Sequence, residues 1–495
     1  MYLLGIDIGT SSIKVSVIDA ATHECIGAAH YPETEAEIKS SQPGWAEQSP
    51  IDWWENTQKA IRKLQDSAGI NLHEIAAIGI AYQMHGLVLV DEHQNVLRDS
   101  IIWCDSRAVE LGDAAFESIG REKCLHSLLN SPGNFTASKL AWVKENEPEI
   151  YQKIYKMMLP GDFIAMKLTG EISTSIPALS EGIFWDFRAN DVSKDLLDYY
   201  GIQQSLIPEI KPLFSVHGTV KASVSTLLGL PEGIPVSYKS GDQPNNALSL
   251  NVLKPGEIAA TAGTSGVIYG VSEKLAYDEQ SRVNTFAHVT YSNSTPHTGV
   301  LLCINGTGSM YRWARHNFAP DLSYNAINSL SATAPIGSKG LIVLPFGNGA
   351  ERMLGNKFTG AQIKGIDLNL HTRADIFRAV QEGIACAFRY GLDILRENGM
   401  QVKVIRAGSA NLFLSDVFAQ TFVDLTGISL ELYQNDGSVG AAIGAGIGAG
   451  MFSSAEEAFS KHEIVKHFQP KNSEAYEGIY QQWKKTLQIE LNNQN

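Results

Sequence analysis

Residues 5–14 read GIDIGTSSIK, and residues 260–267 read ATAGTSGV. In each stretch an apolar, strand-like run enters a Gly-Thr-Ser turn and a second strand-like run leaves it, which predicts a β-hairpin with a hydroxyl-rich tip. Glycine lets the backbone approach an anion closely, and the N–H groups and hydroxyls of such a turn can donate to phosphate. The repetition predicts two similar domains that bind one polyphosphate.

Length and charge fit this division. The chain has 495 residues, more than the roughly 250–300 that one hydrophobic core usually supports, so we predict domains at residues 1–246 and 247–495. The net charge of −14 leaves no basic stripe for nucleic acid or an anionic membrane surface, and we expect neither as a partner. The oligomeric state stays open, with a homodimer as one possibility.

The cysteines and the apolar segments point to a cytoplasmic enzyme. Five cysteines are scattered without CxxC spacing, which predicts neither a disulfide framework nor a zinc site. The N-terminal apolar run lacks a basic segment and is interrupted by Asp7, so we expect no signal peptide. Residues 439–452 are too short and too rich in glycine to span a membrane, and they predict a helix packed closely on a sheet or a ligand.

Alternating strand and helix patterns predict an α/β fold with mixed sheets. At the N-terminus three strands are expected as an antiparallel meander, followed by a helix that begins after Ser49 and ends at Gly69. The predicted strands are residues 2–8, 13–19, 25–31, 75–81, 100–107 and 402–407. The predicted helices fill most of residues 108–129, 138–168, 372–398 and 414–426.

Two carboxylates stand beside the repeated turns. Asp7 lies two residues before Gly9, where it could hold Mg²⁺ together with phosphate oxygens or only stabilise the turn. Asp242 follows Gly241, and in a cleft it could take the proton of a substrate hydroxyl that attacks a γ-phosphate. A Gly-Asp pair by itself is more often a surface turn.

Polar and aromatic residues also follow two of the predicted strands. Met84 and His85 come after one strand, and Trp103 and Asp105 come after the next. Ligands of open α/β sheets bind beyond the carboxyl ends of strands, so these four residues are candidates for a small polyol site. A histidine at such a place is more often structural than ligand-binding.

Together these segments resemble the FGGY family of carbohydrate kinases, and within it the xylulokinases. The matching segments keep the family's order and span nearly the whole chain, which makes the set specific. They are GIDIGTSSIK (5–14), GWAEQSPIDWW (44–54), QMHG (83–86), IWCDSR (102–107), FTASKLAWV (135–143), GD (241–242), GTSG (263–266), ER (351–352) and GSVGAA (437–442).

The resemblance implies an α/β fold of two ribonuclease-H-like domains of the actin and sugar-kinase type, with a nucleotide cleft between them. It implies ATP and Mg²⁺, with Asp242 as the catalytic general base and Asp7 as the metal-linked carboxylate. The expected substrate-binding residues are Met84, His85, Trp103, Asp105 and Gln243. The expected phosphate- and nucleotide-binding residues are Gly9, Thr10, Ser11, Ser12, Lys14, Gly263, Thr264, Ser265, Gly408 and Ser409.

The activity implied is transfer of the γ-phosphate of ATP to a primary hydroxyl of a ketopentose, from D-xylulose to D-xylulose 5-phosphate. Several segments depart from the family pattern, among them Gln243, where an Asn often follows the catalytic aspartate. Residues 239–241 read Lys-Ser-Gly where glycines often precede the catalytic aspartate, and residues 406–408 read Arg-Ala-Gly at the adenosine site. The same chemistry on L-ribulose, L-xylulose or gluconate therefore stays open, as does a non-catalytic ATP-binding module of the actin type.

Overall fold

The computed structural model describes residues 1–493, which form two compact units. The first unit contains Met1–Asn251 together with Phe286–Thr298 and Asp436–His462. The second contains Val252–Thr285, Gly299–Asn435 and the segment that begins at Glu463. Both units are discontinuous in sequence, because two later segments of the chain belong to the first unit. The domain boundary that we expect between residues 246 and 247 remains a prediction.

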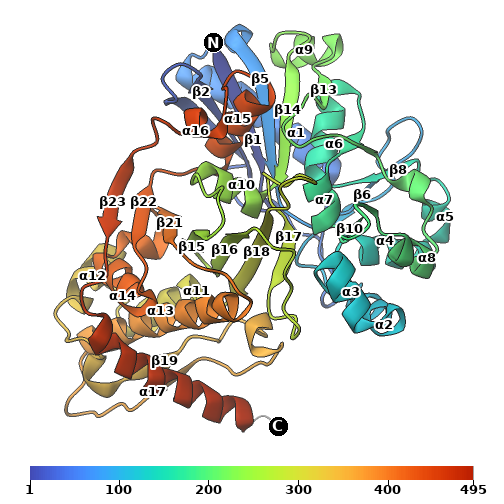
Figure 1. The fold of residues 1–495 in the computed structure, drawn as a ribbon. Helices are drawn as coiled ribbons and strands as arrows, with labels where there is room; N and C mark the ends of the chain where they lie inside the picture. The colour runs from blue at the N-terminus through green and yellow to red at the C-terminus, as the bar shows by residue number, and fades with distance from the viewer. Residues whose placement is uncertain (494–495) are drawn as a thin grey trace. The chain divides into compact units, whose positions relative to one another are not determined.

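The sheet of the first unit contains the predicted meander and two parallel strands (Figure 1). Strand β1 pairs antiparallel with β2, and β2 pairs antiparallel with β3. On its other side β1 is parallel to β5, β5 is parallel to β14, and β13 closes the edge in the antiparallel sense. The bounds are β1 Tyr2–Ile8, β2 Ile13–Asp19, β3 Cys25–Tyr31, β5 Ile75–Tyr82, β13 Gly218–Thr219 and β14 Pro235–Gly241. The three strands predicted for the meander are confirmed.

Six strands of the second unit repeat this order. Strand β15 pairs antiparallel with β16 and parallel with β21, β21 is parallel to β22, and β23 is antiparallel beyond it. The other neighbour of β16 is β18. The bounds are β15 Glu257–Ala262, β16 Gly266–Ser272, β18 Thr298–Ile304, β21 Val404–Gly408, β22 Leu430–Tyr433 and β23 Ile464–Phe468. The predicted duplication of a mixed α/β unit is confirmed.

Helix α15 (Gly437–Gly448) packs on β1, β5 and β14 in the first unit (Figure 1). A Cβ atom on Gly5 of β1 would lie 1.7 Å from the carbonyl oxygen of Ser438, and one on Gly79 of β5 would lie 1.9 Å from that of Ala441. Glycines on the strands therefore let the helix backbone approach the sheet. This confirms the close packing predicted from the glycine-rich segment. Among residues 1–493 no helix combines the length and the apolar character that a membrane span requires.

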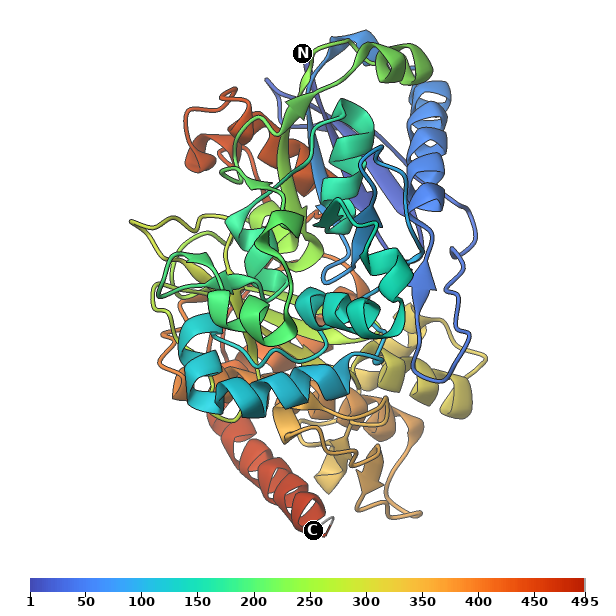
Figure 2. The ribbon, with the colours of Figure 1, turned by 90° about the vertical axis from the view of Figure 1, so that its right-hand side faces the viewer.

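The opposite face of that sheet is covered by α1 (Pro50–Ala68) and α6 (Pro160–Thr169). Side chains alternate between the faces of a strand, so the neighbours of Gly5, Leu4 and Ile6, point away from α15 and into the apolar core with α1. Helix α1 has Ser49 as its N-cap and ends at Gly69 in the left-handed conformation, as predicted. Figure 2 shows α1, in blue, beside the strands of its unit.

One sequence prediction for the segment after α1 is wrong. The strand expected over residues 100–107 is only β7 (Ser100–Ile101), because the chain turns after Ile102. Helices fill most of residues 138–168, as predicted, and Pro148 and Pro160 each begin a new helix there. The elements of this segment are α4 (Thr136–Asn146), α5 (Pro148–Tyr151), strand β8 (Lys156–Met158) and α6.

The remaining elements of the first unit are short. Its other helices are α2 (Val109–Ile119), α3 (Arg121–Leu128), α7 (Ile176–Glu181), α8 (Lys194–Tyr200), α9 (Ala222–Leu228), α10 (Asp242–Ser249) and α16 (Ala455–Ala458). Its other strands are β4 (Glu47–Gln48), β6 (Val88–Val90), β9 (Ser173–Thr174), β10 (Trp185–Asp186), β11 (Asp191–Val192) and β12 (Glu209–Ile210).

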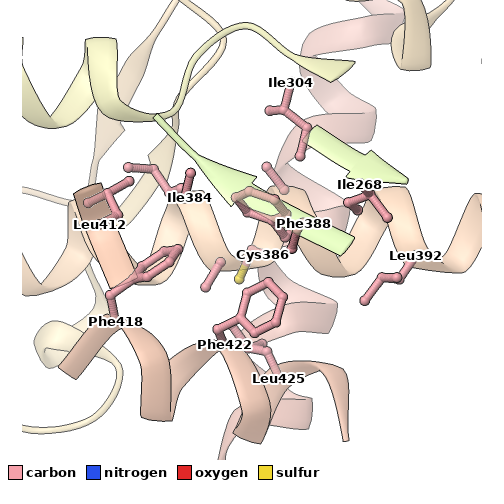
Figure 3. Close-up of a cluster of buried hydrophobic side chains, with 14 of the residues drawn as sticks. Ile268, Ile304, Ile384, Cys386, Phe388, Leu392, Leu412, Phe418, Phe422 and Leu425 are labelled. Carbon is pink, nitrogen blue, oxygen red and sulfur yellow. The ribbon is translucent and has the colours of Figure 1, made fainter. Parts of the chain in front are cut away.

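The core of the second unit lies between its sheet and two long helices, α13 (Arg373–Glu397) and α14 (Asp416–Thr426). Phe388 of α13 meets Phe422 of α14 with ring centroids 5.4 Å apart, and Figure 3 shows Ile268 of β16 beside them. Burying each such side chain contributes about 1.5–3 kcal/mol. The helices predicted over residues 372–398 and 414–426 are confirmed. Further elements are β17 (Asn284–Ala287), whose last two residues belong to the first unit, α11 (Gly308–Phe318), α12 (Tyr324–Ser331), β19 (Ile342–Leu344), β20 (Gln362–Lys364) and α17 (Ser473–Asn492).

Candidate active site

Three aspartates from distant segments meet at the carboxyl ends of the first unit's parallel strands. Asp7 lies near the end of β1, Asp242 begins α10 directly after β14, and Asp436 is the N-cap of α15. Asp7 is electrostatically coupled to both Asp242 and Asp436. A Cβ atom on Gly437 would lie 2.5 Å from Oδ2 of Asp7, so the N-terminus of α15 lies directly against that carboxylate. We call these three aspartates the acidic cluster.

The surroundings of the acidic cluster favour a proton acceptor near neutral pH. Burial, reinforced by the charge of Asp7, raises the pKa of Asp242 to about 7, although hydrogen bonds from Gln243 act in the opposite sense. Burial also raises the pKa of Asp7 to about 6, although Lys14, its cross-strand neighbour on β2, opposes this rise. A carboxylate with a pKa near 7 is suited to general-base chemistry.

The acidic cluster also fits a divalent cation that arrives with phosphate. Within residues 1–493 no group of three or more His, Cys, Asp or Glu side chains has the arrangement that would hold a metal ion by itself. A few carboxylates completed by phosphate oxygens and water are the ligands that Mg²⁺ prefers. The repulsion between Asp7 and Asp242, which raises the pKa of Asp242, is relieved when such a cation binds.

The first Gly-Thr-Ser hairpin joins β1 to β2 and is fixed through Thr10. The Thr10 hydroxyl donates to Oε1 of Gln83 at 3.1 Å and accepts from Nε1 of Trp103 at 2.9 Å. The Gly9 N–H donates to the carbonyl of Ser12 at 3.2 Å and closes the turn. The hydroxyls of Ser11 and Ser12 and the ammonium of Lys14 form no hydrogen bond or ion pair among the residues that the structure covers. These three groups are therefore available to an anion.

His85 follows β5 in the left-handed region, with a φ of 62°. Its ring lies edge-on to Phe135, with centroids 4.8 Å apart, and tilted against Phe286 at 5.4 Å. The buried ammonium of Lys139 donates to its carbonyl at 2.9 Å. These contacts fix His85, which the sequence predicts as a substrate-binding residue. Its neighbour Met84 is buried.

Glu181, the last residue of α7, joins this group although nothing in the sequence marks it. Its Oε1 accepts from the N–H of His85 at 3.3 Å. A Cβ atom on Gly241 would lie 2.5 Å from its Oε2 and 2.6 Å from Cγ of Met84, so the carboxyl lies beside the residue that precedes Asp242. We call Met84, His85, Glu181, Asp242 and Gln243 the acceptor cluster.

Asp105 and Trp103, two further predicted substrate contacts, have other partners. Both oxygens of Asp105 accept from the guanidinium of Arg107 at 2.7–3.0 Å, and Oδ2 also accepts from the N–H of Ala46 at 2.6 Å. Trp103 is 53% exposed and donates to Thr10. The structure brings Trp103 to the first hairpin and places Asp105 in a buried ion pair, so we leave Asp105 out of the acceptor cluster.

Lys239, at a position where the sequence resemblance led us to expect glycine, forms a buried ion pair. Nζ of Lys239 lies 2.5 Å from Oδ1 of Asp162 on α6 and 2.6 Å from the carbonyl of Ser173. This pairing accounts for a charged residue inside β14, because a buried ammonium needs a partner.

The second Gly-Thr-Ser hairpin is fixed to the start of α11. The carbonyl of Gly263 accepts from the N–H of Gly308 at 2.9 Å, and that of Thr264 accepts from the N–H of Ser309 at 3.0 Å. A Cβ atom on Gly308 would lie 2.3 Å from the Gly263 carbonyl oxygen, so this approach requires glycine. A cavity of about 330 Å³ opens beside the hairpin, a size typical of small-molecule sites. It is lined by Ala262, Gly263, Thr264, Gly308, Tyr311, Arg312, Tyr324, Asn325, Asn328, Asn411, Leu412 and Leu414.

Three predicted nucleotide residues lie outside that lining. Ser265 is in the same turn, and Gly408 and Ser409 follow at the end of β21, where the N–H of Ser409 donates to the carbonyl of Tyr433 at 2.7 Å. The cavity takes its lining from the next few residues, beginning at Asn411. The tyrosines and asparagines of α11 and α12 were missed because an amphipathic helix pattern does not show which polar residues face a ligand.

Comparisons with known proteins agree with this geometry. The N-terminal domain model of the FGGY family of carbohydrate kinases matches residues 2–249, and the C-terminal domain model matches residues 258–449. The chain is 27% identical to the xylulose kinase of Bacillus subtilis, over 98% of this chain and 96% of that protein. It is 30% identical to the xylulose kinase of Staphylococcus epidermidis, over 97% of each. A solved xylulose kinase from Rhodospirillum rubrum has a TM-score of 0.86 at 25% identity, over 99% of each chain.

Two similar α/β units, each with a hydroxyl-rich hairpin, define a two-domain kinase of the actin and sugar-kinase type. The chain belongs to the FGGY family of carbohydrate kinases. The resemblance seen in the sequence motifs and the fold class it implied are therefore confirmed.

Proposed function

We propose that the protein transfers the γ-phosphate of ATP to a primary hydroxyl of D-xylulose and forms D-xylulose 5-phosphate. The observation that carries this proposal is the position of Asp242, a carboxylate with a pKa of about 7 that belongs to both the acidic cluster and the acceptor cluster. The xylulose kinases among the relatives support the choice of sugar. A cytoplasmic location belongs to the proposal, because the reaction consumes ATP.

Asp242 is the general base of this reaction. The sugar hydroxyl oxygen attacks the γ-phosphorus, the bond from that phosphorus to the bridging oxygen of ADP breaks, and the hydroxyl proton passes to the Asp242 carboxylate. Because phosphoryl transfer depends mainly on positioning and on neutralising charge, one oriented base is sufficient. Gln243 hydrogen-bonds the same carboxylate and orients it.

The hairpins and Asp7 bind the other reactants. The hydroxyls of Ser11 and Ser12 and the ammonium of Lys14 are free to donate to the terminal phosphates. Asp7 would hold Mg²⁺, which neutralises charge on the phosphates when it is bound. The cavity of the second unit offers hydroxyls, amides and leucine side chains to a nucleoside.

A coupled assay of ADP release with D-xylulose and ATP tests the proposal. Turnover that depends on both substrates is expected, with mass spectrometry locating the new phosphate on the primary carbon. The phosphate on another carbon, or no turnover with any ketopentose, would contradict it.

A further inference from the structure

Glu181 is bound to His85 at both its backbone and its side chain. Only 2% of the residue is exposed. Its carbonyl oxygen lies 2.9 Å from Nδ1 of His85, and its Oε1 accepts from the N–H of the same residue. The end of α7 is thereby fixed to the turn that presents Met84 and His85.

The second oxygen of the carboxyl, Oε2, lies on the side of Gly241 and Asp242. It occupies the space that a side chain on residue 241 would need, at 2.5 Å from the position of a Cβ atom there. Gly241 immediately precedes Asp242, and the charges of Glu181 and Asp242 are electrostatically coupled. The Glu181 carboxyl therefore reaches from the predicted sugar contacts to the start of α10.

In the part of the chain that the structure describes, Glu181 forms no ion pair with lysine or arginine. The two buried ammonium groups nearby in the fold have other partners: Lys139 donates to the carbonyls of His85 and Ile102, and Lys239 donates to Asp162 and Ser173. Burial raises the pKa of Glu181 well above its usual range, and the charges of Asp242 and Asp162 act in the same direction.

A buried acid without a counter-charge lowers stability, because its ionised form loses hydration. Such a group is neutral or negative and is never positive. Its carboxyl can exchange hydrogen bonds with a hydroxyl in either protonation state, since a hydroxyl both donates and accepts. A ligand carboxylate at the same place would instead face Asp242 and Glu181 together and would lose its hydration without a cation to replace it.

We propose that Glu181 determines acceptor specificity, pairing its carboxyl with a hydroxyl of an uncharged sugar and disfavouring acceptors that carry a carboxylate. This inference rests on the proposed function and deepens it, because it separates ketopentoses from sugar acids such as gluconate, which share the same phosphoryl-transfer chemistry.

The first test uses the unaltered protein with ATP and four acceptors: D-xylulose, L-xylulose, L-ribulose and D-gluconate. ADP release gives kcat/KM for each, and calorimetry gives the affinity for D-xylulose and for D-gluconate. We expect kcat/KM for gluconate to be at least about 100-fold below that for the best ketopentose, since a polar mismatch in a desolvated site has effects of this size. Equal efficiency with gluconate would overturn the inference.

The second test uses two variants of Glu181. Glu181→Gln keeps the shape and hydrogen-bonding capacity but cannot be negative, so the gluconate-to-xylulose ratio of kcat/KM should rise about 10-fold while KM for xylulose changes little. Glu181→Ala removes the partner of the sugar hydroxyl, so KM for xylulose should rise about 10-fold with a smaller change in kcat. If Glu181 were only structural, the variants would change thermal stability but would not change the gluconate-to-xylulose ratio of kcat/KM. They would also not raise KM for xylulose more than they lower kcat.

Glu382→Gln is the matched control, because Glu382 is also buried but belongs to α13 of the second unit. It should leave the substrate ratio unchanged. If D-xylulose is phosphorylated and Glu181→Gln leaves the ratio unchanged, the specificity role is wrong and the proposed function stands. If no sugar is phosphorylated by the unaltered protein, the proposed function fails and this inference fails with it.

Discussion

The two Gly-Thr-Ser hairpins share a sequence and a place in their sheets but differ in their surroundings. Carboxylates lie near the first hairpin. Asp7 is on the strand that enters the hairpin, and Asp242 and Asp436 are electrostatically coupled to Asp7. The second is fixed by backbone hydrogen bonds to α11, and none of the residues that line its cavity is acidic.

The different surroundings fit two separate tasks for one kind of turn in the proposed mechanism. Carboxylates beside the first hairpin can hold a cation and accept a proton, as the reacting phosphate requires. The amide- and hydroxyl-rich cavity beside the second can hold a neutral base and ribose without repelling the phosphates. In the proposed mechanism the turn binds phosphate in both units, and its neighbours decide the chemistry.

Removing the carboxylate of the first hairpin should have the largest effect. In Asp7→Asn the site keeps its shape but loses a charge that would bind Mg²⁺, so kcat should fall by a factor of about 10² or more. The Mg²⁺ concentration for half-maximal rate should also rise, as measured by ADP release over a magnesium titration. Asp186→Asn, a change at another buried aspartate of the first unit, is the control. An unchanged magnesium requirement in Asp7→Asn would refute the assignment.

The role of Asp242 as the general base predicts that kcat/KM depends on pH. The base must be ionised, and the pKa of Asp242 in the free enzyme is about 7. We therefore expect kcat/KM for the sugar to fall about tenfold for each pH unit below 7 and to level off above it. Initial rates between pH 5.5 and 9 at saturating ATP measure this profile. A flat profile across neutrality would exclude Asp242 as the base.

Matched glycine substitutions should separate the two hairpins. Gly308→Ala forces a Cβ atom to within 2.3 Å of the Gly263 carbonyl oxygen, so the second hairpin must shift and KM for ATP should rise about 10-fold. Gly437→Ala brings a Cβ atom to 2.5 Å from Oδ2 of Asp7, so kcat should fall instead. Steady-state kinetics with each substrate varied distinguish these outcomes. The same kinetic defect in both variants would mean that the hairpins do not divide the work in this way.

The smallest expected effect is on stability. The pKa of Asp242 is raised from 3.8 to about 7 by folding, so the folded state binds more protons than the unfolded state between these values. The free energy of unfolding therefore falls as pH rises from about 4 to about 7. Asp242→Asn cannot ionise and should therefore have a higher free energy of unfolding than the parent at pH 8. Denaturant titrations at pH 5 and pH 8 measure this; a variant less stable than the parent at pH 8 would contradict it.

Much of the fold could be predicted from the sequence because its signals are local. Alternating apolar residues marked β1, β2 and β3, and Ser49 and Gly69 marked the ends of α1. The strand expected over residues 100–107 was wrong because contacts from a distant segment fix a turn there: Asp105 accepts from the N–H of Ala46, and Arg107 pairs with Glu47.

The candidate site was predictable where a motif carries its own chemistry. Asp7 and Asp242 stand beside recognisable turns, and the structure brings them together at parallel strand ends. Asp436 and Glu181 were missed, because Asp436 is 429 residues from Asp7 and Glu181 is 96 residues from His85, and each acquires its neighbours only when α15 and α7 pack on the sheet. No local pattern encodes such contacts.

The most direct test of the division between the hairpins is to measure Asp242→Asn for turnover and for nucleotide affinity side by side. We predict that kcat with D-xylulose falls by a factor of about 10² or more, while the Kd for ATP, measured by calorimetry, stays within about twofold of the parent value. Near-normal turnover, or an equal loss of nucleotide affinity, would contradict the account.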